Sequence, residues 1–230
     1  MELIAIVPAR GGSKRLPRKN LLPFAGVPLI ERVVRTLSGC SLVSKVIVST
    51  DDLEIADLAQ SAGGLVPQLR STDLSDDFTA TAPVVLDALG WLDSTPKDED
   101  LVLVAYPTSV FLDGTLIDRL VDRIAHQDVE HVFVAVELGC PIGRSWSRQG
   151  EIWRAFDPIE YFARSQDLPE AFSDAGQGYV SRKSAWQKLA QGVIPSSAAV
   201  VVDRWEAIDI DTESDFKLAE AIFRATRSSG

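Results

Sequence analysis

The sequence predicts an α/β fold, with a mostly parallel central sheet and helices on both of its faces. Short apolar runs alternate four times with amphipathic helical segments, the pattern of strands joined by crossover helices. Polar loops follow the carboxyl ends of several of these runs, where open α/β sheets bind their ligands. The 230 residues are 46% hydrophobic and contain no internal repeat or linker. We therefore expect one domain over residues 1–230.

Charge and composition exclude several classes of function. A net charge of −10 argues against a nucleic acid or a membrane surface as partner. The N-terminus enters a predicted strand without a signal peptide, and no apolar run approaches membrane-spanning length. Cys40 and Cys140 are far apart and form no metal or redox motif, which favours a reducing, cytoplasmic setting. His126 and His131 are the only histidines, so a His-rich metal site is excluded.

The first part of the chain carries the regular alternation. A capping box at residues 51–54 opens one helix, Gly63 and Gly64 end it, and Asp113 caps a later helix. Apolar runs predict strands at residues 3–7, 45–49, 101–105 and 131–136. Helical periodicity predicts helices at residues 28–37, 51–62, 79–92 and 113–124.

The alternation breaks between Cys140 and Gln177. This stretch is rich in Trp, Arg and Pro, with one possible short strand at residues 152–156. We interpret it as an inserted lobe or dimerisation arm at about residues 140–177. The sheet pattern then resumes, with strands at 178–180, 198–202 and 208–211 and helices at 184–189 and from Thr212 onward.

The loop after the first strand, residues 10–20, predicts a phosphate site. It holds two adjacent glycines, Ser13, five cations and Asn20 in an acidic protein. Adjacent glycines let backbone N–H groups turn toward an anion, and Arg and Lys add charge-assisted donors. The loop has neither the G-x-x-x-x-G-K-[ST] nor the G-x-G-x-x-G spacing, so it is not one of the two commonest nucleotide loops. The alternative is a solvated basic loop with a glycine turn.

Asp209 and Asp211 form the second candidate for a site. They are two residues apart in a strand-like segment, so both carboxylates point to one face. Two carboxylates near substrate phosphates suit Mg²⁺. The alternative is the polar face of an edge strand, with Thr212 as the cap of the last helix.

Other polar segments carry weaker signals. From composition alone, residues 164–169 and 173–177 are ordinary loops. Asp76 and Asp77 most simply cap the helix that begins near Thr79.

The motif PARGGSK-x-x-P-x-KN at residues 8–20 resembles the signature of the sugar-acid cytidylyltransferases, the CMP-sialic acid synthetase group. Further motifs of that group follow in order: VSTDD at 48–52, Arg70 with DLSDD at 73–77, R-x-Q-D-L-P at 164–169 and DID at 209–211. Within the group, DDFT at 76–79 and DAGQ at 174–177 look most like pseudaminic acid cytidylyltransferases. The sialic acid enzymes have Gln where this chain has Tyr106, which argues against sialic acid.

The resemblance implies a Rossmann-like nucleotidyltransferase (GT-A-like) fold and an enzyme that needs Mg²⁺. It implies the transfer of CMP from CTP to the anomeric hydroxyl of a nine-carbon 2-keto sugar acid, pseudaminic acid being favoured, with release of pyrophosphate. It also implies a homodimer in which the inserted lobe reaches the partner's site. The alternatives are sialic or legionaminic acid as substrate, the ketodeoxyoctonate family, or a catalytically silent relative that binds a nucleotide.

The resemblance also implies roles for the residues within each motif. The resemblance assigns CTP binding to Ala9, Arg10, Gly11, Ser13, Lys14, Lys19, Asn20, Arg70, Asp77 and Thr81. It assigns the sugar acid and dimer contacts to Tyr106, Arg164, Gln166, Asp167 and Gln177. The catalytic set is Arg10, Lys19, Asp209 and Asp211, and the two aspartates are the metal ligands.

Overall fold

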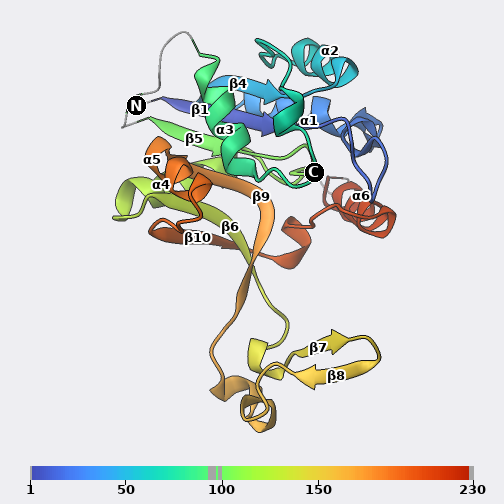
Figure 1. Cartoon of the computed structure of the whole chain (residues 1–230), viewed down its shortest axis with the longest axis vertical. Helices are drawn as coiled ribbons and strands as arrows, with labels where there is room; N and C mark the ends of the chain where they lie inside the picture. Colours follow the sequence, from blue (N-terminus) through green and yellow to red (C-terminus); the bar gives the residue numbers. More distant parts are fainter. Residues whose placement is uncertain (1, 93–96, 98–99, 228–230) are drawn as a thin grey trace.

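A computed structural model describes residues 2–92, 97 and 100–227 of the chain. Its centre is a six-stranded sheet in the order β10-β6-β9-β5-β1-β4 (Figure 1). Five of the six strands run parallel, and β9 runs antiparallel between β5 and β6. The predicted α/β class with a mostly parallel sheet is therefore confirmed. The sheet strands are β1 (Leu3–Pro8), β4 (Val43–Ser49), β5 (Leu101–Val104), β6 (His131–Glu137), β9 (Phe172–Arg182) and β10 (Ser197–Val202).

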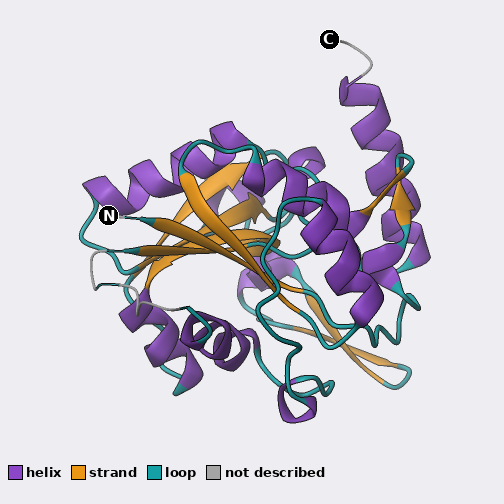
Figure 2. Cartoon of the chain, turned by 90° about the horizontal axis from the view of Figure 1, so that it is seen from above, coloured by secondary structure: helices purple, strands orange, loops and turns teal. Residues whose placement is uncertain are grey.

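Helices cover both faces of the sheet, as the view from above shows (Figure 2). Successive side chains of β1 point to opposite faces of the sheet, so the strand contacts both layers of helices. Ala5 and Val7 face the layer of α1, α2 and α4, whereas Ile4 and Ile6 face the layer of α3 and α5. All four side chains are buried, and each buried isoleucine contributes about 1.5–3 kcal/mol to the free energy of folding. The helices are α1 (Leu29–Ser38), α2 (Leu53–Ser61), α3 (Thr81–Gly90), α4 (Gly114–His126), α5 (Lys183–Ala190) and α6 (Glu213–Arg227).

A third, smaller apolar cluster lies between the N-terminal and C-terminal parts of the chain. Phe24, the last residue of the short strand β2 (Pro23–Phe24), which pairs with β3 (Val27–Pro28), packs edge-on against Phe216 and Phe223 of α6. Ile210 is fully buried in the same cluster. The cluster therefore holds the end of the chain beside the loop that follows β1.

The structure corrects four local predictions. Strand β9 begins at Phe172, so residues 173–177 belong to the sheet rather than to a loop or to the inserted lobe. Residues 208–211 are irregular rather than strand. Asp52, not Asp51, caps α2, because its carboxylate accepts from the backbone N–H groups of Glu54 and Ile55. Helix α3 begins at Thr81, two residues later than predicted.

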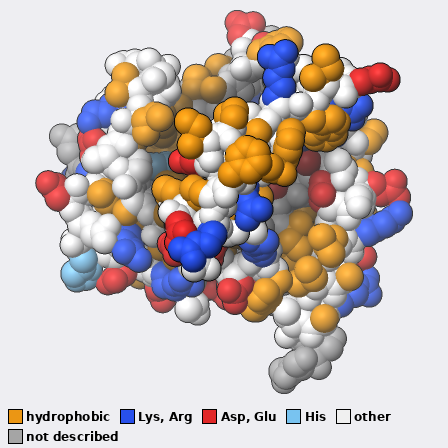
Figure 3. All heavy atoms as spheres, turned by 90° about the horizontal axis from the view of Figure 1, so that it is seen from below, with side chains coloured by type: hydrophobic (Ala, Val, Ile, Leu, Met, Phe, Trp, Pro, Cys, Tyr) orange, Lys and Arg blue, Asp and Glu red, His pale blue; other side chains and the backbone are white. Residues whose placement is uncertain are grey.

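The segment between β6 and β9 projects away from the sheet (Figure 1). It contains a hairpin of β7 (Trp146–Gln149) and β8 (Ile152–Ala155) and three short 3-10 turns, η3 (Ile142–Arg144), η4 (Glu160–Phe162) and η5 (Ser165–Asp167). Many of its apolar side chains are exposed, and hydrophobic side chains gather on the face seen from below (Figure 3). The exposed apolar residues are Ile142, Trp146, Ile152, Trp153, Phe156, Ile159 and Phe162.

Within the residues that the structure describes, no helix is both long and apolar enough to cross a membrane.

Candidate active site

A cavity of about 640 Å³ opens at the carboxyl ends of β1 and β5. Its walls combine the loop after β1, the segment before α3, the loop after β5 and the segment before α6. The lining residues are Pro8, Arg10, Ser13, Lys14, Arg15, Lys19, Asn20, Arg70, Leu74, Asp76, Asp77, Phe78, Thr79, Thr81, Val84, Tyr106, Pro107, Thr108, Asp209 and Asp211. The cavity thus brings together both candidate sites of the sequence, the cationic loop and the Asp209/Asp211 pair.

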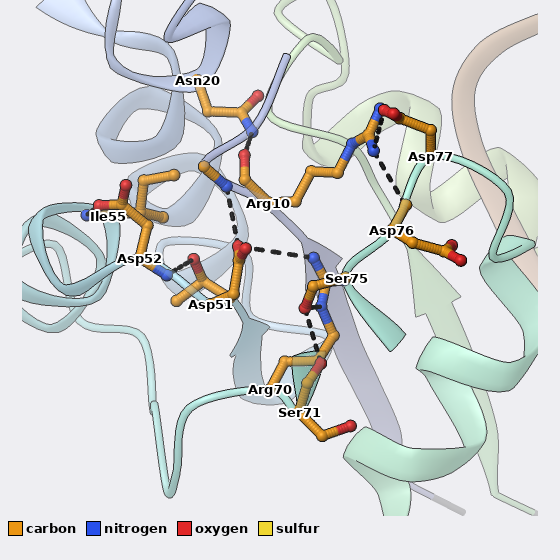
Figure 4. Close-up of polar contacts among 12 residues, drawn as sticks. Arg10, Asn20, Asp51, Asp52, Ile55, Arg70, Ser71, Ser75, Asp76 and Asp77 are labelled. Atoms are coloured by element: carbon orange, nitrogen blue, oxygen red, sulfur yellow. Dashed lines mark hydrogen bonds and ion pairs between the residues drawn. The ribbon is translucent and has the colours of Figure 1, made fainter. Parts of the chain in front are cut away.

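Two cations of the loop pair with Asp77 across the cavity. The Arg10 guanidinium donates to the Asp77 carboxylate at 2.7 Å and to the Asp76 carbonyl at 2.9 Å (Figure 4). Lys14 forms an ion pair with the other oxygen of the same carboxylate. Hydrogen bonds from Lys14 and Arg10 lower the pKa of Asp77, so this carboxylate is ionised at neutral pH. Asp77 therefore contacts the cations of the loop, and Asp76 rather than Asp77 caps the turn at Thr79.

Two other cations reach the segment before α6. Lys19 Nζ donates to the Ile210 carbonyl at 2.7 Å and to Asp211 Oδ1 at 3.2 Å. Arg15 Nη1 lies 2.7 Å from Asp211 Oδ2. These contacts join the first loop to the last segment of the fold and place positive charge directly beside the predicted metal ligands.

Asp209 faces the cavity without a hydrogen-bond donor in the part of the chain that the structure describes. Burial and the neighbouring Asp211 carboxylate raise the pKa of Asp209, while Lys19 and Arg15 oppose the shift. A carboxylate destabilised in this way is suited to bind a cation. The described residues contain no cluster of three or more metal-ligating side chains. Two adjacent carboxylates suit Mg²⁺, which takes one or two carboxylates and completes its shell with water and substrate phosphates.

Arg70 and Tyr106 line the inner wall. Arg70 is 6% exposed, and burial lowers its pKa. Its Nε donates to the Ser75 hydroxyl at 3.2 Å, whereas Nη2 has no hydrogen-bond partner among the described residues and lies 3.9 Å from the Asp51 carboxylate (Figure 4). The Tyr106 hydroxyl pairs with the Thr81 hydroxyl at 2.6 Å. The unused Arg70 donor suits a neutral acceptor such as a base carbonyl, because a buried donor without a partner is costly.

Gly11, the first of the two adjacent glycines, acts differently from the prediction. The Gly11 N–H donates to Asp51 at 2.8 Å instead of being free for an anion (Figure 4). A Cβ at Gly11 would lie 2.6 Å from the Asp52 carboxylate, so close packing requires this glycine. Asn20 is buried and donates to the Arg10 carbonyl at 2.9 Å. Asn20 and Gly11 therefore shape the loop, while side chains supply the donors that face the cavity.

Several predicted site residues do not line the cavity. Ala9 is fully buried at the end of β1. Arg164 and Asp167 form an ion pair with each other on the projecting segment, at 2.7 Å. Gln166 beside them is exposed, and Gln177 is fully buried in β9. The five predicted sugar contacts therefore lie in the cavity, on the projecting segment and inside β9. Within the described chain, Tyr106 is the one of the five that lines the cavity.

Sequence reasoning missed three residues at or beside the cavity. Arg15 belongs to the cationic loop, and only its pairing with Asp211 distinguishes it from a solvated arginine. Asp51 was assigned to a cap, but its carboxylate holds Gly11 instead. Phe78 is 92% exposed at the cavity rim, a position that hydrophobic periodicity does not mark.

Comparisons with known proteins agree with this geometry. A family model described as cytidylyltransferase matches residues 4–174. The chain is 32% identical over 231 residues to a pseudaminic acid cytidylyltransferase of Campylobacter jejuni, covering 100% of this chain and 99% of the relative. It is 30% identical over 237 residues to a CMP-N,N'-diacetyllegionaminic acid synthase of Legionella pneumophila, with the same coverage.

Solved structures support the same fold. A CMP:2-keto-3-deoxy-manno-octonic acid synthetase complexed with CTP superposes with a TM-score of 0.71 at 16% identity, covering 98% of this chain and 100% of that one. The predicted nucleotidyltransferase fold and the predicted resemblance to sugar-acid cytidylyltransferases are both confirmed. The chain is an enzyme of the cytidylyltransferase family.

Proposed function

We propose that this enzyme transfers CMP from CTP to the anomeric hydroxyl of a nine-carbon 2-keto sugar acid and releases pyrophosphate. The observation that carries the proposal is that Arg10, Lys14 and Lys19 line the same cavity as the Asp209/Asp211 pair. The cations suit a triphosphate, and the two neighbouring carboxylates suit the metal ion that accompanies it. Full-length similarity to enzymes named for pseudaminic and legionaminic acid supports a sugar acid as acceptor.

The chemistry asks the protein mainly for positioning and charge neutralisation. The anomeric hydroxyl attacks the α-phosphorus of CTP in line, an O–P bond forms, and the bond to the β-phosphate oxygen breaks as pyrophosphate leaves. Arg10 and Lys19 neutralise the charge that develops on the departing pyrophosphate. Arg70 lines the cavity, and its guanidinium would bind the cytosine. Together these side chains fix the nucleotide at its base and at its phosphates.

Asp209 and Asp211 would hold Mg²⁺, which supplies charge neutralisation at the phosphates when it is bound. Lys19 keeps Asp211 oriented through its hydrogen bond of 3.2 Å. Because Lys19 also faces the cavity, the same ammonium group serves the carboxylate and the nucleotide.

Pseudaminic acid is the favoured sugar acid. The similarity to the Campylobacter jejuni enzyme covers the whole chain at 32% identity. Tyr106, which replaces the Gln of the sialic acid enzymes, lines the cavity and pairs with Thr81. A buried aromatic ring in place of an amide removes donors and acceptors that a more hydroxylated sugar would use.

We further propose that the enzyme is a homodimer and that residues 140–177 include the dimerisation arm. The projecting segment exposes Trp146, Trp153 and Phe162 to solvent in one chain. Exposed apolar side chains gathered on a projection are typical of a protein interface. The pair Arg164 and Asp167 on the same segment would then meet the sugar acid in the partner's cavity. A cytoplasmic location is consistent with a CTP-dependent reaction and with two free cysteines.

The test is a substrate panel. Purified protein, CTP and Mg²⁺ are combined with pseudaminic, legionaminic or N-acetylneuraminic acid, and pyrophosphate release is followed. We expect the largest kcat/KM for pseudaminic acid. A larger value for legionaminic acid would correct the sugar alone. Release with none of the acids, in a protein that binds CTP, would indicate a catalytically silent relative instead.

A further inference from the structure

The segment that carries Asp209 and Asp211 is not held by the sheet. It is irregular and lies between η6 (Arg204–Glu206) and α6. Three side chains hold its backbone instead: Asp215 accepts from the Asp211 N–H at 3.2 Å, and two donors bind carbonyl groups on either side of Asp209. Lys19 Nζ donates to the Ile210 carbonyl at 2.7 Å, and Gln177 Nε2 donates to the Ile208 carbonyl at 3.2 Å. The two carbonyls flank Asp209, so the place of this carboxylate depends on one donor from each side.

A bulge in β9 forms the floor beneath the same carboxylate. Phe133 of β6 pairs with Tyr179 and Ala135 with Asp174, so residues 175–178 of β9 stand opposite one residue of β6. Such bulges re-aim side chains next to active sites. Gly176 in the bulge has a φ of +64°, and a Cβ added there would lie 3.4 Å from the Asp209 carboxyl carbon. The backbone at Gly176 therefore packs directly against Asp209.

The bulge is also tied to the loop after β5. The Ser109 hydroxyl accepts from the Tyr106 N–H at 3.0 Å and lies 3.4 Å from the Gly176 carbonyl. The bulge thus connects the wall that holds Tyr106 with the wall that holds Asp209. A shift of β9 at this point would move both walls of the cavity.

Gln177 is 0% exposed and does not line the cavity, so its side chain has no route to a sugar acid bound there. Burying an amide is costly unless its hydrogen bonds serve the fold or the site. We propose that Gln177 is a positioning residue: its amide, together with Gly176, sets the place of the Asp209 carboxylate for binding a divalent cation with CTP. This inference deepens the proposed function and rests on it for the identity of the nucleotide.

Mn²⁺ is the probe, because free Mn²⁺ is counted directly by electron paramagnetic resonance and no turnover is needed. Gln177→Met keeps the length of the side chain and removes the donor to Ile208. With CTP present and no sugar acid, we expect Gln177→Met to bind Mn²⁺ about 3- to 10-fold more weakly than wild type, the loss of one hydrogen bond. Gln60→Met, on the exposed face of α2, is the matched control and should bind as wild type.

Kinetics separate a positioning role from a sugar contact. We expect Gln177→Met to raise the Mg²⁺ concentration for half-maximal pyrophosphate release while the KM for the sugar acid stays within about twofold of wild type. A raised KM for the sugar acid with unchanged Mn²⁺ binding would overturn the proposal and make Gln177 a sugar contact. If Mn²⁺ binding and the KM for the sugar acid are both unchanged in Gln177→Met, the proposal is overturned as well.

Gly176→Ala tests the contact between the β9 bulge and Asp209. This variant tests the proposal if Gln177→Met does not fold. Alanine is strained at the positive φ of Gly176, and relief of this strain shifts the backbone that lies in van der Waals contact with the Asp209 carboxyl group. We therefore expect Mn²⁺ binding to weaken again, in a variant that still unfolds in one thermal transition. Unchanged Mn²⁺ binding in folded Gly176→Ala would contradict the packing argument. The Mn²⁺ measurement needs no sugar acid. A wild-type protein that binds Mn²⁺ with CTP but activates no sugar acid would therefore contradict the proposed function and leave the role of Gln177 testable.

Discussion

Replacing Lys19 by methionine tests the point where the first loop and the last segment meet. The Lys19 side chain is 18% exposed, and its ammonium group donates to Ile210 and Asp211. Methionine keeps the apolar stem and removes both donors. If the same ammonium group also binds a phosphate of CTP, one charge-assisted hydrogen bond of about 1.5–3 kcal/mol is lost, which is a factor of about 10 to 150 in affinity.

The loss of the two internal hydrogen bonds also lowers the free energy of unfolding. At about 1 kcal/mol for each bond, the thermal unfolding midpoint should fall by about 4–8 °C in a chain of this size. The dissociation constant of CTP is measured by titration calorimetry with Mg²⁺ and without sugar acid, at a temperature where the variant is folded. Lys45→Met, near the amino end of β4 and away from the cavity, is the control.

An unchanged dissociation constant for CTP in folded Lys19→Met would refute the phosphate role of the loop. It would leave Lys19 as a purely structural link between the loop and Asp211. A large rise in the KM for the sugar acid, with CTP binding intact, would place the sugar rather than the triphosphate beside Lys19.

Three further perturbations follow from the same geometry. Asp211→Ala should fold, since its backbone stays in the cap of α6, yet lose Mg²⁺-dependent pyrophosphate release by roughly 100-fold or more; near-wild-type turnover would remove Asp211 from the metal site. Asp77→Asn should tighten CTP binding about two- to fivefold in calorimetry, because it frees Arg10 and Lys14 from an exposed ion pair; weaker binding would mean that Asp77 orients the two cations. Burial lowers the pKa of His131 from its usual value of about 6.5, so the unfolded chain binds more protons as the pH falls below that value and the free energy of unfolding declines. The thermal unfolding midpoint should therefore drop less steeply between about pH 7 and 5 in His131→Gln, and an equal slope in both proteins would exclude His131 as the cause.

The sequence was informative wherever a local pattern and burial agree. The continuous apolar run of β1 is buried against both helical layers, and the apolar stripes of α1 and α4 face one layer of the core, so these local patterns predicted the three elements. The cationic loop and the DID motif, which the sequence singled out, both contribute residues to the lining of the cavity. Residue types and their spacing were enough to single out these two segments.

Other features depend on pairing that no local pattern records. Residues 173–177 are polar and rich in glycine, yet they join β9 because β5 and β6 supply partners on both sides. The alternation of residues 208–211 imitates a strand, but no neighbouring strand pairs with it in the described structure. The sequence does not distinguish Asp51 from Asp52 as the cap of α2. Their roles differ because the Asp51 carboxylate accepts from the Gly11 N–H, whereas the Asp52 carboxylate accepts from the Glu54 N–H.

The central claim is that the cavity joins CMP to a sugar acid, and product stoichiometry tests it most directly. Wild-type protein is incubated with CTP, Mg²⁺ and pseudaminic acid, pyrophosphate is counted, and the products are weighed by mass spectrometry. We predict one CMP-sugar for each pyrophosphate released. Pyrophosphate accompanied by free CMP and unchanged sugar acid, or no consumption of CTP at all, would contradict the claim.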